Sequence, residues 1–193
     1  PEYVDNNYEY IVDTERAHTV IQELLQESIL GMDIETTGLD PLVDNLRLVQ
    51  IANQTATYLF DLNHLDKEVL RPILEGPCKK LLHNAKFDIR FLMCKFEGIL
   101  VPNIFCTMVI DQVVNRGVHS RKLHEVSEDR VWMTLNKESQ TSDWGAKVLT
   151  KAQLKYAAAD ASVLLPIHDE LIRRAEELKL MPSVELENRV VPL

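Results

Sequence analysis

The sequence predicts an α/β fold in which a mixed sheet is surrounded by helices. The first half of the 193-residue chain carries short β-branched or apolar runs separated by turn residues, and the second half carries apolar residues at helical spacing. No repeat, low-complexity tract or Gly/Ser linker divides the two halves. We therefore expect a single domain that covers residues 1–193.

Five runs predict strands, at 8–12, 29–35, 46–52, 57–62 and 80–84. Turn-like stretches at 41–45 and 53–56 join the second, third and fourth runs, so these three should form an antiparallel meander. A meander that is extended by parallel strands and followed by helices indicates a ribonuclease H-like sheet. It does not fit a doubly wound dinucleotide-binding sheet.

Helices are predicted over 14–26, 85–96, 106–115 and 121–130, and a longer one from Thr150 to Lys179 that Pro166 should bend. The first begins at a capping Asp13 or Thr14. The helix over 85–96 carries two apolar ridges, so it should be buried on two sides. Ala157 and Ala161 should keep the surface of the last helix low and let its backbone approach a neighbour.

Charge and composition narrow the class of protein. The formal net charge of −9 argues against broad electrostatic binding of duplex DNA, so any nucleic-acid contact should be local. No run approaches the roughly 18 apolar residues that a membrane span needs. The three cysteines form no C-x-x-C pair, which predicts reduced thiols and a cytoplasmic protein.

Two carboxylates end the strand in "GMDIETTGLD" (31–40). Asp33 and Glu35 are two residues apart, so they share a face of the strand, and bringing both out of water is costly unless a cation compensates. A solvated strand end is the simpler alternative.

Two later stretches, 82–92 and 154–165, add carboxylates on predicted helices. Asp88 should lie at the shoulder of an apolar stripe, and Asp160 shares a helix face with Tyr156 four residues earlier. An aspartate favoured by the helix dipole and a boundary aromatic are the simpler explanations. Carboxylates with no histidine or thiol at ligand spacing favour Mg²⁺ or Mn²⁺ over zinc.

Taken together and in order, "MDIETTGLD", "HNAKFD" and "YAAAD" resemble the three motifs of the DEDD family of 3′-5′ exonucleases. The tyrosine four positions before the last aspartate marks the tyrosine subclass; the sister subclass has histidine where Lys155 stands. The likeness is greatest to the proofreading exonuclease domain of bacterial family A DNA polymerases, the DNA polymerase I type. The segments 135–160 and 184–193 support it, and the start at Pro1 leads us to expect a piece of a longer polymerase chain.

The resemblance implies a function and its residues. It implies removal of nucleoside 5′-monophosphates from single-stranded DNA 3′ ends by two-metal-ion hydrolysis, in a cytoplasmic, nucleoid-associated protein. Two Mg²⁺ or Mn²⁺ ions would be held by the four carboxylates, and Tyr156 would orient water. Substrate-binding positions fall on Thr36, Leu39 and Asn84. An RNA-trimming exonuclease of the ribonuclease D type, or a non-catalytic polymerase module, stays open as an alternative.

Several further residues are candidates for substrate contact. Phe87 or Phe91 would stack on bases unless they are core residues. Backbone phosphates could be met by Lys86, Arg90, Arg121 and Lys122, each of which could equally be solvated surface charge. Trp144 is expected to anchor a loop by packing.

Overall fold

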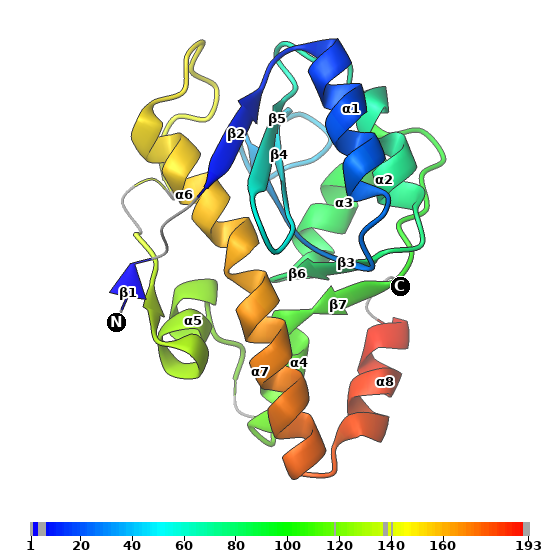
Figure 1. Cartoon of the computed structure of the whole chain (residues 1–193), viewed down its shortest axis with the longest axis vertical. Helices are drawn as coiled ribbons and strands as arrows, with labels where there is room; N and C mark the ends of the chain where they lie inside the picture. The colour runs from blue at the N-terminus through cyan, green and yellow to red at the C-terminus, as the bar shows by residue number, and fades with distance from the viewer. Residues whose placement is uncertain (1, 4–6, 118, 137–138, 140, 191–193) are drawn as a thin grey trace.

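A computed structural model gives the fold, and it describes all residues except 1, 4–6, 118, 137–138, 140 and 191–193 (Figure 1). Parts of the segments 135–160 and 184–193 therefore lie outside the described residues. The central sheet has six strands in the order β2-β5-β4-β3-β6-β7. Its strands are β2 (Tyr8–Ile11), β3 (Ile29–Thr36), β4 (Leu46–Ala52), β5 (Thr57–Asp61), β6 (Lys79–Leu82) and β7 (Ile104–Cys106).

The mixed sheet confirms the expected fold class. Strands β3, β4 and β5 form the predicted antiparallel meander, while β2 joins β5, β6 joins β3 and β7 joins β6 in parallel. A separate parallel pair joins β1 (Glu2–Tyr3) to β8 (Met133–Thr134). The five predicted strands are confirmed, and each agrees with the structure to within two residues at either end. They were predicted at 8–12, 29–35, 46–52, 57–62 and 80–84.

The four shorter predicted helices, over 14–26, 85–96, 106–115 and 121–130, also agree with the structure to within two residues at either end. The helices of the structure are α1 (Thr14–Leu24), the 3₁₀ helix η1 (Lys67–Leu70), α2 (Arg71–Glu75), α3 (Ala85–Lys95), α4 (Thr107–Val114), α5 (Leu123–Val131), α6 (Lys151–Ser162), α7 (Leu164–Glu177) and α8 (Met181–Val190). The helix predicted over 106–115 begins one residue later, because Cys106 ends strand β7. The elements not predicted from the sequence are the strands β1, β7 and β8, the 3₁₀ helix η1 and the helices α2 and α8.

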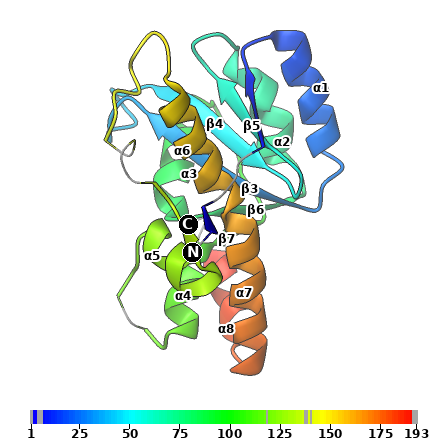
Figure 2. The ribbon, with the colours of Figure 1, turned by 60° about the vertical axis from the view of Figure 1, so that its left-hand side comes forward.

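The prediction of a single long helix from Thr150 was wrong. Helix α6 ends at Ser162 and α7 begins at Leu164, with Val163 between them. Pro166 has no amide hydrogen to donate to the carbonyl of Ser162, and its ring crowds that carbonyl. The chain therefore breaks the helix three residues before the proline instead of bending at it. Figure 2 shows that α7 continues the course of α6 down the molecule.

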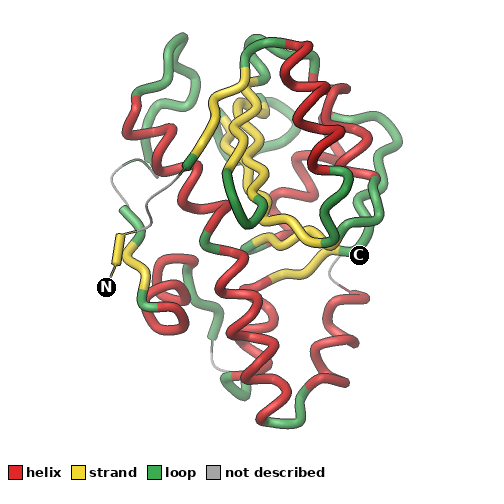
Figure 3. The backbone as a smooth tube through the Cα atoms, in the orientation of Figure 1, coloured by secondary structure: helices red, strands yellow, loops and turns green. Residues whose placement is uncertain are grey.

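Helices cover the sheet on both faces (Figure 3). Leu30, Met32 and Ile34 of β3 belong to a buried cluster with residues of α1 and α3. The intervening Gly31, Asp33 and Glu35 face the side on which α6 packs against β3, β4 and β5. Strand periodicity thus aims the two carboxylates at α6. Within the described residues, no helix is long and apolar enough to cross a membrane.

Close approach of α6 to β3 depends on small residues. Ala157, Ala158 and Ala161 are fully buried, as the run of alanines in the sequence indicated. A Cβ atom on Gly31 would lie 2.2 Å from the carbonyl oxygen of Ala161, so only glycine fits there. This contact brings Asp160, one residue before Ala161, over the strand that carries Asp33.

Helix α3 differs from the expectation of two buried sides. Phe91 and Leu92 are buried, but Met93 is 56% exposed and Cys94 is also exposed. Asp88, expected at the shoulder of the apolar stripe, is instead 3% exposed. The helix is rotated so that the aspartate, in its first turn, faces the sheet.

Candidate active site

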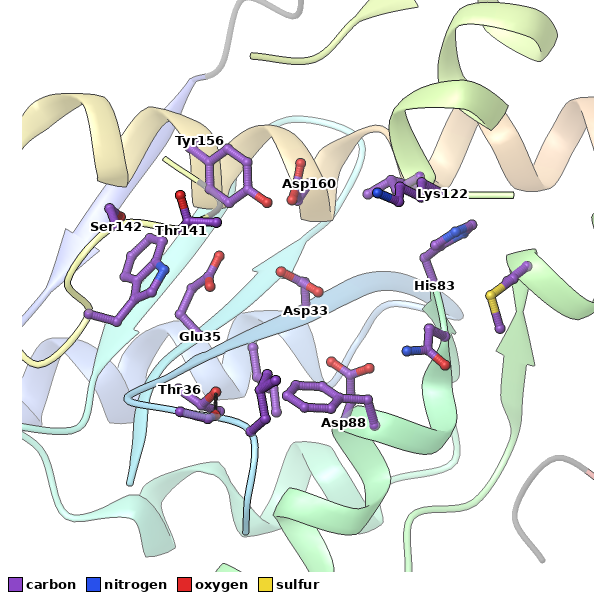
Figure 4. A pocket seen from close by; sticks show the side chains of 18 of the residues that line it. Asp33, Glu35, Thr36, His83, Asp88, Lys122, Thr141, Ser142, Tyr156 and Asp160 are labelled. Atoms are coloured by element: carbon purple, nitrogen blue, oxygen red, sulfur yellow. Dashed lines mark hydrogen bonds between the residues drawn. The ribbon is translucent and has the colours of Figure 1, made fainter. Parts of the chain in front are cut away.

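The carboxylates from three separate stretches of the chain line one cavity of about 690 Å³ (Figure 4). Strand β3 supplies Asp33 and Glu35, helix α3 supplies Asp88, and helix α6 supplies Asp160. All eight residues predicted from the sequence line it: Asp33, Glu35, Thr36, Leu39, Asn84, Asp88, Tyr156 and Asp160. The structure therefore brings these eight positions to one cavity.

Strand β3 presents its two carboxylates next to a buried amide. The register pairs Asp33 with Gln50 of β4, and the pairing becomes irregular between Glu35 and Thr36, where the strand ends. The Gln50 Nε2 amide donates to Asp33 Oδ2 at 3.2 Å and to Glu35 Oε1 at 3.5 Å. One amide group therefore touches both carboxylates.

Asp88 reaches the cavity through the turn that begins α3. The preceding Asn84 has a φ of 59°, in the left-handed region that asparagine tolerates better than most residues. This turn aims the first helical residues toward β3. Burial raises the pKa of Asp88 well above its ordinary value, and the backbone groups of Asp88 and Ile34 only partly oppose that effect.

Asp160 and Tyr156 stand one helical turn apart on α6. Burial raises the pKa of Asp160 to about 7, although a hydrogen bond from Tyr156 acts in the opposite direction. Burial and the nearby charges of Asp160 and Glu35 raise the pKa of Tyr156 as well. Tyr156 therefore stays a neutral hydroxyl that donates to Asp160, and Figure 4 shows its oxygen directed toward that carboxylate.

The carboxylates repel one another as well as being buried. Burial raises the pKa of Asp33, and the charges of Asp88 and Asp160 raise it further. Glu35 behaves in the same way, with burial first and then Asp33, Asp160 and Asp88. A compact set of acids that resist ionisation is a source of folding instability unless positive charge enters it.

The donor chemistry of the site fits a hard divalent cation, whereas its side-chain positions do not yet enclose one. All four acids offer oxygen ligands, which Mg²⁺ and Mn²⁺ prefer. In the part of the chain that the structure describes, no three His, Cys, Asp or Glu side chains lie close enough together to hold an ion as they stand. The fit therefore rests on the type, burial and mutual repulsion of the ligands.

Another wall of the cavity is formed by the segment that leads into α5, which contacts His83. His83 lies with Nδ1 2.9 Å from Thr107 Oγ1 and Nε2 2.9 Å from the Arg121 carbonyl oxygen. Burial lowers the pKa of His83 to about 4, so its imidazole is neutral and donates through Nε2 to that carbonyl. Arg121 is itself held by Asp111, at 2.6 Å and 2.8 Å. Lys122 extends into the cavity on the side of Asp160 (Figure 4).

The further candidates for substrate contact divide into residues that line the cavity and residues that do not. Arg121, Lys122 and Phe87 line the cavity, whereas Lys86, Arg90 and Phe91 do not; Phe91 is a core residue. Trp144 is buried against Tyr156, with ring centroids 6.2 Å apart, and it also lines the cavity. Its loop-anchoring role is consistent with this packing.

Gln50 was missed from the sequence, although a signal was present. It is the one amide in the apolar run "LRLVQIA", where Arg47 is the other polar residue. Taken with the predicted meander, its position on the neighbouring strand would have placed it opposite the carboxylates. Thr141 and Ser142, which also line the cavity, carry no such signal because they lie in an irregular loop.

Known proteins are similar to this chain in sequence. Residues 8–176 match the sequence profile of the 3′-5′ exonuclease family of the DNA polymerase A type. The chain is 35% identical over 182 residues to DNA polymerase I of Aquifex aeolicus, which covers 93% of this chain and 30% of the polymerase. It is 26% identical over 189 residues to ribonuclease D of Escherichia coli, which covers 97% of this chain and 50% of that enzyme.

A solved structure agrees with the sequence relatives. The crystal structure of Escherichia coli ribonuclease D, an exoribonuclease involved in structured RNA processing, gives a TM-score of 0.87 at 26% identity, over 96% of this chain and 50% of that chain. This likeness confirms the ribonuclease H-like fold. The chain spans half or less of the length of these relatives. Because the family profile covers most of the sequence, the chain belongs to the 3′-5′ exonuclease domain family.

Proposed function

We propose that this domain removes nucleoside 5′-monophosphates from the 3′ end of single-stranded DNA, as a proofreading exonuclease. The observation that carries the proposal is the meeting, at one cavity, of a neutral tyrosine and four carboxylates, of which Asp88 and Asp160 are buried and Asp33 and Glu35 partly buried. The profile match and the higher identity to a DNA polymerase, 35% against 26% to 29% for ribonuclease D sequences, favour DNA as the substrate.

The four carboxylates would hold two Mg²⁺ or Mn²⁺ ions. Asp33, Glu35 and Asp160 would bind one ion, and Asp33 with Asp88 the other. When bound, such ions lower the pKa of water and stabilise the charge that develops on phosphate oxygens. Their charge would also offset the repulsion that raises the pKa values of the acids.

The remaining residues position the strand and the water. In the reaction, the water oxygen bonds to phosphorus while the bond to the 3′ oxygen of the shortened strand breaks. Because the raised pKa of Tyr156 keeps its proton in place, it would orient the water by hydrogen bonding and not act as a base. Leu39, 82% exposed at the cavity rim, and Phe87 would stack on the terminal bases. Thr36 and Asn84 would contact the same nucleotides.

A second candidate is an RNA-trimming exonuclease. The likeness to ribonuclease D covers 97% of this chain, so that reading has support of its own. Both reactions need the same carboxylates and differ only in whether the site tolerates a 2′-hydroxyl group. A polymerase domain in the same polypeptide and a cytoplasmic, nucleoid-associated location belong to the DNA proposal.

The test is a parallel assay of DNA and RNA. Single-stranded oligonucleotides of one sequence, labelled at the 5′ end, are incubated with the protein in Mg²⁺, Mn²⁺ or chelator. We expect chelator-sensitive shortening from the 3′ end, faster on DNA, and nearly none with Asp33→Asn or Asp88→Asn. Asp169→Asn is the matched control, because that side chain is 72% exposed on α7.

Two outcomes would contradict the proposal. Faster shortening of RNA would assign the domain to RNA trimming. A protein that shortens neither strand in either metal would be a non-catalytic module.

A further inference from the structure

The buried amide of Gln50 is unusual for a strand core. The residue is fully buried in β4, between Val49 and Ile51 of the apolar core. A side-chain amide has four hydrogen-bonding positions, two donors and two acceptor lone pairs. Within the described residues, the Gln50 side chain makes two hydrogen bonds and donates both, to Asp33 and to Glu35.

The other end of the amide is without a partner. Gln50 Oε1 is buried and accepts no hydrogen bond from the residues that the structure describes. Native proteins leave few buried polar atoms unsatisfied, and those they keep call for an explanation. Turning the amide over would take away the two amide hydrogens that Asp33 Oδ2 and Glu35 Oε1 accept, and it would set the amide oxygen against both acids when these are ionised. The orientation therefore satisfies the carboxylates at the expense of the glutamine.

We propose that Gln50 is a positioning residue that uses the two hydrogens of one amide to fix Asp33 and Glu35 relative to each other. The inference rests on the proposed function, in which these two acids bind a divalent cation. The geometry supports it from the sheet upward: antiparallel register sets Gln50 directly across from Asp33, on the face that both carboxylates share. Strand β4 is buried along its whole length, so the amide cannot swing away.

The arrangement leaves the carboxylates able to bind an ion. Each carboxylate has two oxygens with about four lone-pair positions, and Gln50 uses one position on each. Partners that orient ligating side chains in this way typically change metal affinity or activity by about 10- to 100-fold when they are removed. Gln50 would act through Asp33 and Glu35 without touching the ion or the substrate.

The experiment compares Mn²⁺ binding in the absence of nucleic acid. Gln50→Met keeps the length of the side chain and removes the amide, and Leu48→Met is the matched control on the same strand and face, opposite Glu35. Mn²⁺ affinity is measured from the electron paramagnetic resonance signal of the free ion, and folding from the thermal midpoint in chelator. Exonuclease activity is then measured as a function of Mn²⁺ concentration.

We expect Gln50→Met to weaken Mn²⁺ binding by about 10- to 100-fold and Leu48→Met to leave it unchanged. The thermal midpoint in chelator should stay close to that of the parent, because removing the orphaned acceptor offsets the loss of two donated bonds. Saturating Mn²⁺ should restore most of the activity of Gln50→Met. That recovery separates positioning from a defect of the fold.

Several results would overturn the proposal. If the parent binds Mn²⁺ and Gln50→Met binds it equally well, Gln50 does not position the acids, while the proposed function stands. If the parent binds no Mn²⁺, both the function and the inference are wrong. Should Gln50→Met fail to fold, Gln50→Asn replaces it, because asparagine keeps the amide but shortens its reach. If Gln50→Asn binds Mn²⁺ as tightly as the parent, or if neither variant folds, the inference is wrong.

Discussion

Removing a site carboxylate is expected to stabilise the protein when no metal is bound. In the folded chain the pKa of Asp160 is raised to about 7 by burial, against an ordinary value of 3.8. Each pKa unit corresponds to about 1.4 kcal/mol, so ionising Asp160 in the folded state costs at most about 4 kcal/mol. Asp160→Asn removes that cost and keeps an oxygen to accept from Tyr156. Because the new amide must still be buried, we expect a net gain of about 1 to 3 kcal/mol in the free energy of unfolding.

The sign of the pH dependence follows from proton binding. Between about pH 4 and pH 7 the folded parent keeps a proton on Asp160 that the unfolded chain has released. The free energy of unfolding of the parent should therefore fall as pH rises through this window and stay low at pH 8. The advantage of Asp160→Asn should be absent near pH 4 and complete at pH 8.

The assay is urea unfolding in chelator at pH 4, 6 and 8, with an opposite control. Asp111 is also a buried aspartate, but its hydrogen bonds from Arg121 and Arg130 outweigh burial and lower its pKa. Asp111→Asn should therefore destabilise the protein at pH 8, by about 3 to 5 kcal/mol. Saturating Mn²⁺ should stabilise the parent more than Asp160→Asn, because the ion binds only the folded state and the variant lacks one of the proposed ligands. An Asp160→Asn protein that is less stable than the parent in chelator at pH 8 would refute the reasoning.

Three further changes test other parts of the site. Tyr156→Phe should lower kcat by about 10²-fold or less with little effect on KM, as measured by steady-state kinetics, because it removes a water-orienting hydroxyl but no ligand. Gly31→Ala should lower both the thermal midpoint and the activity, since its Cβ would meet the Ala161 carbonyl at 2.2 Å; an unchanged midpoint would show that α6 can move away without cost. Lys122→Gln should raise KM for single-stranded DNA and reduce the salt dependence of binding, with the exposed Lys86→Gln as control; equal effects of both would remove Lys122 from the substrate path.

The parts of the fold predicted from the sequence are those with a short-range signal. The meander of β3, β4 and β5 follows from three β-rich runs separated by turns, and its register aims Asp33 and Glu35 at one face. Strand β7 is only three residues long, too short for an alternation to be detected. The helix break at Val163 depends on Pro166, whose effect falls on a carbonyl four residues earlier. The sequence therefore shows the proline that causes the break but does not show the residue at which the helix ends.

The positions of the candidate site residues along the chain follow from motifs in the sequence, whereas the packing around them does not. Each acid lies in a motif that the sequence displays, whereas the depth of its burial depends on how elements pack; the 3% exposure of Asp88 follows from the rotation of α3 against the sheet. Gln50 was missed because its role comes from a neighbouring strand. His83 and Arg121 show the same limit, since their hydrogen bond joins residues 38 positions apart.

The most direct test of the central claim is anomalous diffraction from crystals soaked in Mn²⁺. We predict manganese peaks bounded by Asp33, Glu35, Asp88 and Asp160, with these side chains rotated toward the ion. Manganese bound only elsewhere on the acidic surface, with the four carboxylates left as they stand and no peak among them, would contradict that claim.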